Sequence, residues 1–133
     1  SALLSVRLFS LGETYSNETF TTSVTIDPDT NIDTLGNDIQ NELFYVCKEA
    51  VSNALKHSNG SEVDLVVGLE SSTGEIQLTV QDNGDGMDDV TLRSSGTQNM
   101  EKRMKRIGGA FSLQNANGGG LRARASVSHP NQE

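Results

Sequence analysis

The segment Asp82-Asn83-Gly84-Asp85-Gly86 combines carboxylates with glycines directly after a stretch that is typical of a strand. A calcium-binding loop needs an oxygen donor at its third position and Glu at its twelfth, but Gly84 and Arg93 occupy those positions. A hairpin turn at Asn83-Gly84 would have to be followed by an alternating strand, which is not seen. A carboxylate such as Asp82 can accept a hydrogen bond from the exocyclic amine of adenine, whereas guanine presents a carbonyl there. Because glycines let a flat ligand approach the backbone, the segment predicts a binding site for such a ring.

Three polar residues, Glu49, Asn53 and His57, recur every four residues in the longest helical pattern of the chain, and Lys56 lies beside the last of them. This spacing places them on one face of a helix, roughly opposite its apolar stripe. The carboxamide oxygen of Asn53 can coordinate Mg²⁺ while the metal keeps several waters. The solvated face of an amphipathic helix has the same pattern, so the spacing by itself leaves both interpretations open.

A third polar segment, from Gly96 to Met100, opens the last predicted helix. The free N–H groups at the start of a helix can bind phosphate, and glycine allows a close approach. A basic cluster follows, made of Lys102, Arg103, Lys105 and Arg106. A solvated helix face explains Lys105 and Arg106 equally well. This segment is therefore informative mainly because it follows the other two polar segments along the chain.

Apolar periodicity and turn residues predict the elements that position these three segments. The predicted helices span residues 3 to about 12, 37–57 and 99–107, and the predicted strands span 20–26, 63–69, 76–80, 110–115 and 121–128. Residues 82–96 contain few apolar side chains and are predicted to form a loop. This order predicts an α+β fold, a two-layer α/β sandwich in which about three helices cover one face of a mixed sheet of about five strands.

The 133 residues have the length of one domain, and their composition limits the classes of function. A net charge of −8 opposes binding to nucleic acid over the surface as a whole. Cys47 is the only cysteine, which excludes an internal disulfide and a cysteine-based zinc cage. No apolar run has the length of a membrane span and no signal peptide opens the chain, so we expect no direct membrane contact and a cytoplasmic location.

Taken in order, the three segments resemble the nucleotide-binding boxes of the GHKL superfamily, whose members share the Bergerat ATP-binding fold. Residues 49–57 resemble the N box, in the Glu-first form of NarX-, DesK- and DosT-like histidine kinases. Residues 82–87 resemble the G1 box. Residues 96–103, followed by Ile107-Gly108-Gly109, resemble the shortened G2 region of the same kinases. Each box alone resembles the family only weakly. All three boxes, in this order and at this spacing, resemble it specifically.

The resemblance implies the catalytic ATP-binding domain of a bacterial two-component sensor histidine kinase, with ATP and Mg²⁺ as cofactors. By the resemblance, Asp82 would bind the adenine amine, and Asn53 would coordinate Mg²⁺ with Glu49 as a further possible ligand. Glu49 and Asn53 are thus the candidate catalytic residues. The candidate nucleotide-binding residues come from all three boxes: Asn53, Lys56, His57, Asp82, Gly84, Gly86, Met87, Gly96, Thr97 and Met100.

The resemblance covers nearly the whole chain, from about Phe20 to Pro130. We therefore expect residues 1–133 to be a single ATP-binding domain, with 1–19 as an N-terminal helix and lead-in, 20–130 as the GHKL core and 131–133 as a tail. One departure from the family pattern is Leu121, which stands where these kinases usually have Thr after the last glycine pair.

A kinase of this kind donates the γ-phosphate of MgATP to a histidine on a separate dimerisation domain, for relay to a response regulator. We expect that phosphoacceptor domain to lie outside this chain, because neither His57 nor His129 is followed by an acidic residue. The chain by itself is then expected to be a monomer that binds ATP without phosphorylating itself, and the full-length protein a homodimer. Two alternatives remain: an anti-sigma-factor-type serine kinase, and a degenerate GHKL module that binds a protein partner without nucleotide.

Overall fold

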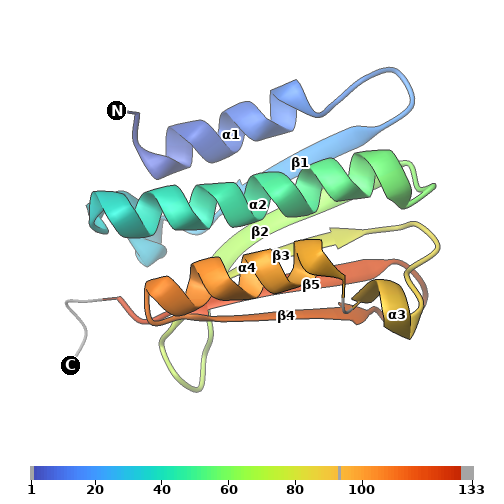
Figure 1. The fold of residues 1–133 in the computed structure, drawn as a ribbon. Coiled ribbons are helices and arrows are strands. Elements are labelled where there is room, and N and C mark those ends of the chain that lie inside the picture. The colour runs from blue at the N-terminus through green and yellow to red at the C-terminus, as the bar shows by residue number, and fades with distance from the viewer. Residues whose placement is uncertain (1, 93, 130–133) are drawn as a thin grey trace.

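The structure is a computed structural model that describes residues 2–92 and 94–129. Within these residues, five strands form one sheet in the order β1-β2-β3-β5-β4, and the three longer helices lie on one of its faces (Figure 1). The strands are β1 Thr21–Ile26, β2 Glu62–Leu69, β3 Ile76–Asp82, β4 Ala110–Asn115 and β5 Leu121–Val127. The helices are α1 Leu4–Thr14, α2 Asn37–His57, the single turn α3 Asp89–Leu92 and α4 Ser95–Arg106, with 3₁₀ turns η1 Pro28–Thr30 and η2 Ile32–Thr34. The predicted two-layer α+β sandwich is confirmed.

The sheet is mixed because β1 and β2 are parallel, whereas the other neighbouring pairs are antiparallel. The parallel pair is joined by a crossover that contains α2. In β2 and β3, apolar and polar residues alternate, so that Leu65 pairs with Val80 and Val67 with Leu78 on the buried face. This period of two residues turns one face of the sheet toward the helices and leaves polar side chains on the other.

The hydrophobic core fills the space between the sheet and the helices. All three longer helices contribute to it: Leu4, Leu8 and Leu11 from α1, Leu43, Val46, Cys47 and Val51 from α2, and Met100 and Met104 from α4. Burial raises the pKa of the Cys47 thiol to about 12. At neutral pH this cysteine is therefore a protonated core residue and does not act as a nucleophile.

The predicted boundaries agree with the structure except around the loop predicted for residues 82–96. Strand β3 continues two residues beyond the prediction, because Gln81 and Asp82 still pair with β2. Helix α4 begins at Ser95, four residues earlier than predicted, and α3 forms within the expected loop. Gly, Thr and Asn have low helix propensity, but burial of Thr97 overrides it in the first turn of α4. Pro130 and the predicted tail at 131–133 lie outside the described residues.

No helix in the described ranges is both long and apolar enough to span a membrane.

The buried side chain of Gln40 joins α1, α2 and the turn before α2. Its Oε1 accepts a hydrogen bond from the backbone N–H of Leu4 at 2.8 Å. Its Nε2 donates to the carbonyl of Leu35 at 2.7 Å and to that of Asp33 at 3.2 Å. One side chain thus pairs backbone groups at the start of α1 and at the entry to α2. It fixes α1 against the helix that carries Glu49, Asn53 and His57.

We expect Gln40→Ala to lower the free energy of unfolding by about 2–4 kcal/mol, because it leaves buried backbone groups of Leu4 and Leu35 unpaired. Asn41→Ala is the matched control: Asn41 is exposed and accepts one hydrogen bond from Arg7 at 2.7 Å. This control should lose less than about 1 kcal/mol. Urea unfolding followed by circular dichroism measures both, and equal losses would show that the Gln40 junction does not hold the fold.

Candidate functional site

Asp82 is the last residue of β3, and its side chain is fixed by two backbone groups from different segments. Its Oδ1 accepts a hydrogen bond from the N–H of Gly84 at 2.9 Å and another from the N–H of Leu121 at 3.1 Å. The residue is 6% exposed. Among the described residues no donor bonds to Oδ2. The carboxylate is therefore held in one orientation, with its second oxygen available to a ligand.

The glycines after Asp82 bring this segment against the end of α2. A Cβ on Gly84 would overlap the backbone carbonyl of Ser58, and the N–H of Asp85 donates to that same carbonyl at 2.9 Å. Gly86 has a φ of +78°, a conformation that favours glycine, and a Cβ there would lie 2.5 Å from Oδ1 of Asn115. The glycine pattern seen in the sequence thus has a structural cause, which is close packing of the chain around Asp82.

A mainly apolar pocket lies beside Asp82 and α2. Its lining consists of Ala50, Asn53, Val80, Asp82, Met87, Ser94, Thr97, Met100, Leu113, Leu121 and Ala123. One carboxylate among apolar walls suits a flat aromatic ring whose edge carries an amine donor. In this conformation the pocket encloses about 40 Å³, less than the roughly 300–1,000 Å³ of pockets that bury a whole ligand. A ring can therefore enter only when lining side chains move apart.

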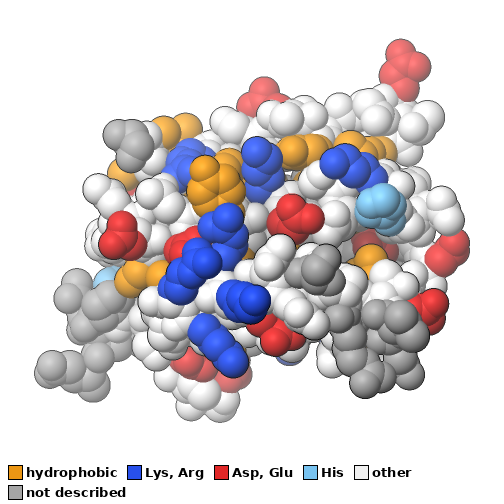
Figure 2. Space-filling view, viewed as in Figure 1, with side chains coloured by type: hydrophobic (Ala, Val, Ile, Leu, Met, Phe, Trp, Pro, Cys, Tyr) orange, Lys and Arg blue, Asp and Glu red, His pale blue; other side chains and the backbone are white. Residues whose placement is uncertain are grey.

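A larger polar groove, of about 410 Å³, adjoins this pocket at Met100, which lines both. It runs between α2 and α4, and its lining consists of Tyr15, Tyr45, Lys48, Glu49, Ser52, Lys56, Gly96, Asn99, Met100 and Arg103. Figure 2 shows Lys and Arg side chains gathered on the face of the molecule that these helices form, although the chain carries a net charge of −8. A groove with this lining suits an anionic group joined to the ring.

The structure brings the residues predicted from the three segments to these neighbouring cavities. Asn53, Asp82, Met87, Thr97 and Met100 line the apolar pocket, and Glu49, Lys56, Gly96 and Met100 line the polar groove. His57 and Gly86 line a small recess that also touches Asn53, Asp82 and Met87. Gly84 takes part through its backbone N–H, which bonds to Asp82. Segments far apart in the sequence thus form one continuous surface.

Asn115 and Leu121 are part of this site and were not predicted as site residues. Oδ1 of Asn115 accepts from the N–H of Met87 at 2.8 Å, and Nδ2 of Asn115 donates to the carbonyl of Met87 at 2.8 Å. This pair of hydrogen bonds holds the backbone of the pocket wall. Leu121 contributes its N–H to Asp82 and its side chain to the apolar lining. The bond to Asp82 uses only the backbone, so it does not depend on the side chain at position 121.

Among the described residues no group of three or more His, Cys, Asp or Glu side chains is placed to hold a metal ion. The amide of Asn53 in the pocket lining and the carboxylate of Glu49 in the groove lining lie one helical turn apart on α2 and can both supply oxygen ligands. Mg²⁺ in nucleotide sites is commonly held by one or two protein oxygens together with phosphates and waters, and this pair fits that pattern.

Residues 38–131 match the family of histidine kinase-, DNA gyrase B- and HSP90-like ATPases. The chain belongs to this family. Membership implies ATP as the ligand, in agreement with an amine-accepting pocket that adjoins a basic groove.

Named relatives of this ATPase domain include sensor proteins. The chain is 34% identical over 91 residues to the sensor histidine kinase LiaS of Bacillus subtilis, a match that covers 67% of this chain and 25% of LiaS. It is 39% identical over 77 residues to the sensor protein VraS of Staphylococcus aureus, covering 56% of this chain and 22% of VraS. The chain thus spans about a quarter of the length of these curated relatives.

Solved structures share the fold of this ATPase domain. The ATP-binding domain of PrrB from Mycobacterium tuberculosis superposes with a TM-score of 0.71 at 20% identity, covering 98% of this chain and 96% of that one. The histidine kinase domain of a blue-light activated kinase from Erythrobacter litoralis gives a TM-score of 0.75 at 15% identity, covering 97% and 60%. The predicted resemblance to the ATP-binding domains of histidine kinases is confirmed at the level of family and fold.

We expect Gly84→Ala to lower the free energy of unfolding by about 1–3 kcal/mol, because the new Cβ collides with backbone atoms of Ser58 that cannot move aside cheaply. Gly68→Ala is the matched control, since nothing lies within 4 Å of a Cβ there and its φ is ordinary. The control should stay within about 0.5 kcal/mol of the original protein. Chemical unfolding tests the pair, and a Gly84 variant as stable as the Gly68 variant would contradict the close packing around Asp82.

Proposed function

We propose that this chain is the catalytic ATP-binding domain of a sensor histidine kinase. In this proposal it holds MgATP and presents the γ-phosphate to a histidine on a separate dimerisation domain, from which the phosphate passes to a response regulator. The observation that carries the proposal is the Asp82 carboxylate, whose Oδ1 is held by two backbone amides while Oδ2 is left for a ligand beside the apolar pocket. The names of the relatives LiaS and VraS support a sensor kinase over a serine kinase.

Recognition of adenine follows from the chemistry of Asp82. The exocyclic amine of adenine donates a hydrogen bond, and the second carboxylate oxygen accepts one. Guanine would place a carbonyl oxygen against that acceptor and leave both groups unpaired in a buried site, which costs free energy. The apolar walls, with Val80, Met100 and Leu113 among them, would contact the faces of the ring. Selectivity for ATP over GTP therefore rests on one side chain.

The phosphates would extend from this pocket into the polar groove. Lys56 offers a cation there, the N–H groups at Gly96 and Thr97 lie in the first turn of α4, and His57 lines the recess beside Asn53. Asn53, with Glu49 as a further possible ligand, would hold Mg²⁺. When bound, Mg²⁺ neutralises charge on the phosphates and orients them for in-line transfer. Phosphoryl transfer requires mainly positioning and charge stabilisation, which these residues are suited to provide.

The phosphoacceptor histidine belongs to another part of the kinase in this proposal. His57 lies at the end of α2 within the site, and Nε2 of His129 lies 3.0 Å from Oγ1 of Thr34, away from the pocket lining. We propose that the chain by itself is a monomer in the cytoplasm, where ATP is available, and that the full-length kinase is a homodimer.

The proposal also treats residues 1–133 as one domain, with 20–130 as the ATP-binding core, 1–19 as a lead-in and 131–133 as a tail. Leucines of α1 pack in the same core as α2 and the sheet, which supports including the lead-in.

We expect the β,γ-methylene analogue of ATP, with Mg²⁺, to bind the protein and to be preferred over the corresponding GTP analogue. Asp82→Asn should weaken binding of the ATP analogue by about tenfold or more. The reason is geometric: in this variant the new carboxamide oxygen keeps the bonds to Gly84 and Leu121, so the NH₂ group faces the donating amine of the ligand. Isothermal titration calorimetry measures these affinities.

Asp85→Asn is the control for this experiment, because Asp85 lies in the same box but is exposed and accepts a hydrogen bond from Asn59 at 3.1 Å. It should change the affinity by less than about twofold. Equal binding of the ATP and GTP analogues, or equal losses in the two variants, would refute adenine recognition by Asp82. Thermal unfolding of each variant shows whether its fold is intact.

A further inference from the structure

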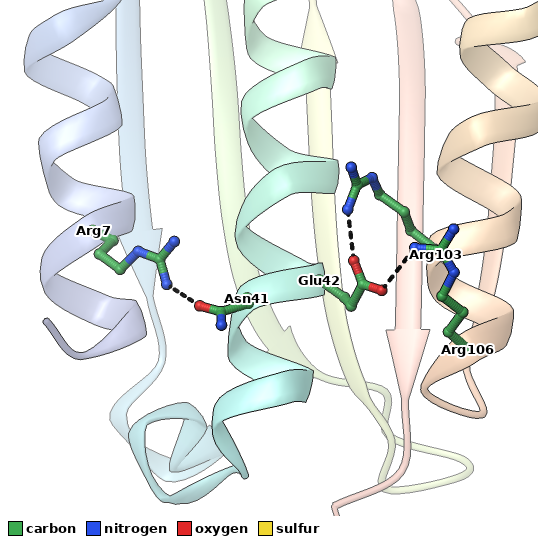
Figure 3. Close-up of polar contacts among 5 residues, drawn as sticks. All are labelled: Arg7, Asn41, Glu42, Arg103 and Arg106. Atoms are coloured by element: carbon green, nitrogen blue, oxygen red, sulfur yellow. Dashed lines mark hydrogen bonds and ion pairs between the residues drawn. The ribbon is translucent and has the colours of Figure 1, made fainter. Parts of the chain in front are cut away.

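One carboxylate on α2 faces two guanidinium groups from α4 (Figure 3). Glu42 accepts a hydrogen bond from Nη1 of Arg103 at 2.7 Å through Oε1 and is 3.3 Å from Nη1 of Arg106 through Oε2. The Glu42 side chain is 16% exposed, whereas those of Arg103 and Arg106 are 38% and 64% exposed. The cluster therefore carries one positive charge more than Glu42 can balance, and either arginine alone is enough to keep this carboxylate paired.

The two arginines differ in what else they contact. The guanidinium carbon of Arg103 lies 4.8 Å from the centre of the Tyr45 ring, an arrangement typical of a cation–π contact. Arg103 also lines the polar groove, whereas Arg106 does not belong to its lining. Arg103 thus stands at the border between the Glu42 cluster and the proposed phosphate groove.

The groove itself is cationic. Three of its lining residues, Lys48, Lys56 and Arg103, are basic, and Glu49 is the one acidic residue in the lining as described. This local excess of positive charge occurs in a chain with a net charge of −8. The groove begins beside the apolar pocket at Met100 and reaches Arg103 one turn further along α4. The lining extends along α4 from Gly96 in its first turn to Arg103, so Arg103 lies in the same groove that would receive the phosphates of a ligand whose ring lies against Asp82.

We propose that Arg103 recognises the terminal phosphate of the nucleotide and so distinguishes ATP from ADP. This inference rests on the proposed function, since it requires an adenine nucleotide in the Asp82 pocket. A guanidinium presents a planar fork of N–H donors that matches phosphate oxygens. Arg103 can turn from Glu42 into the groove without leaving this half-buried carboxylate unpaired, because Arg106 remains beside Glu42. Arg106 thus leaves Arg103 available to bind a phosphate.

Calorimetric affinities for the β,γ-methylene ATP analogue and for ADP, both with Mg²⁺, test this assignment. In Arg103→Ala the affinity ratio of the ATP analogue to ADP should fall by about tenfold or more, while the affinity for ADP stays within about twofold. Lys105→Ala is the matched control, since it removes an exposed cation of α4 that does not belong to the groove lining, and it should keep the ratio of the original protein. Arg103→Lys keeps the charge without the fork and should give an intermediate ratio.

Three outcomes overturn the assignment. Equal losses for both nucleotides in Arg103→Ala would mean that Arg103 only holds α4 in place. An unchanged ratio in a folded Arg103→Ala variant would show no contact with the terminal phosphate, and the Arg103→Lys variant decides the question if the alanine variant does not fold. If the original protein binds neither nucleotide, the proposed function itself fails. If it binds both, and the affinity ratio of the ATP analogue to ADP is the same in the Arg103 variants, only the assignment of Arg103 fails.

Discussion

The site depends on the hydrogen bonds that fix the Asp82 carboxylate at the end of β3. Two N–H groups meet at Oδ1, one from Gly84 just after the strand and one from Leu121 at the start of β5. Because β3 lies between β2 and β5 in the sheet, the register of these strands determines where the carboxylate points. The glycines that follow are needed for the same reason, since a Cβ at Gly84 would collide with the end of α2. An acceptor held this rigidly discriminates between ligands without having to be ordered on binding.

Charge is distributed so that an acidic protein can hold an anionic ligand. The basic residues of the groove come from α2 and α4, the helices that enclose it, and the N–H groups in the first turn of α4 face the same region. The Glu42 cluster joins the two helices at one end of the groove. The Asp82 pocket lies beyond Met100, at the other end of the shared surface. The Asp82 pocket and the polar groove are thus separate parts of one cleft, and both are lined by α2 and α4.

Sequence patterns predicted the elements well where one periodicity dominates. The bounds of α2 and β4 agree with prediction because apolar spacing and glycine stops coincide there. Prediction failed at the start of α4, where Gly96 and Asn99 have low helix propensity and burial decides the conformation. Contacts between residues far apart in the sequence could not be predicted from it. Asn115 forms hydrogen bonds with Met87, 28 positions away, and Arg103 with Glu42, 61 positions away. The residues of the three boxes were identified because the boxes occur in a characteristic order along the chain. The residues that hold them in place, such as Asn115, do not belong to any recognisable sequence pattern.

The central claim is that the surface around Asp82 is the nucleotide site, and an NMR titration with MgADP tests it most directly. In ¹H–¹⁵N correlation spectra, the amide signals of Gly84 and Leu121 and the side-chain amide of Asn53 should shift on saturation. Signals of Gly68 and of its strand partner Gln77, which lie further along the β2–β3 pair from the Val63–Asp82 pairing, should stay in place. Unchanged Gly84 and Leu121 signals at saturating MgADP, with shifts confined to other surfaces, would contradict the account.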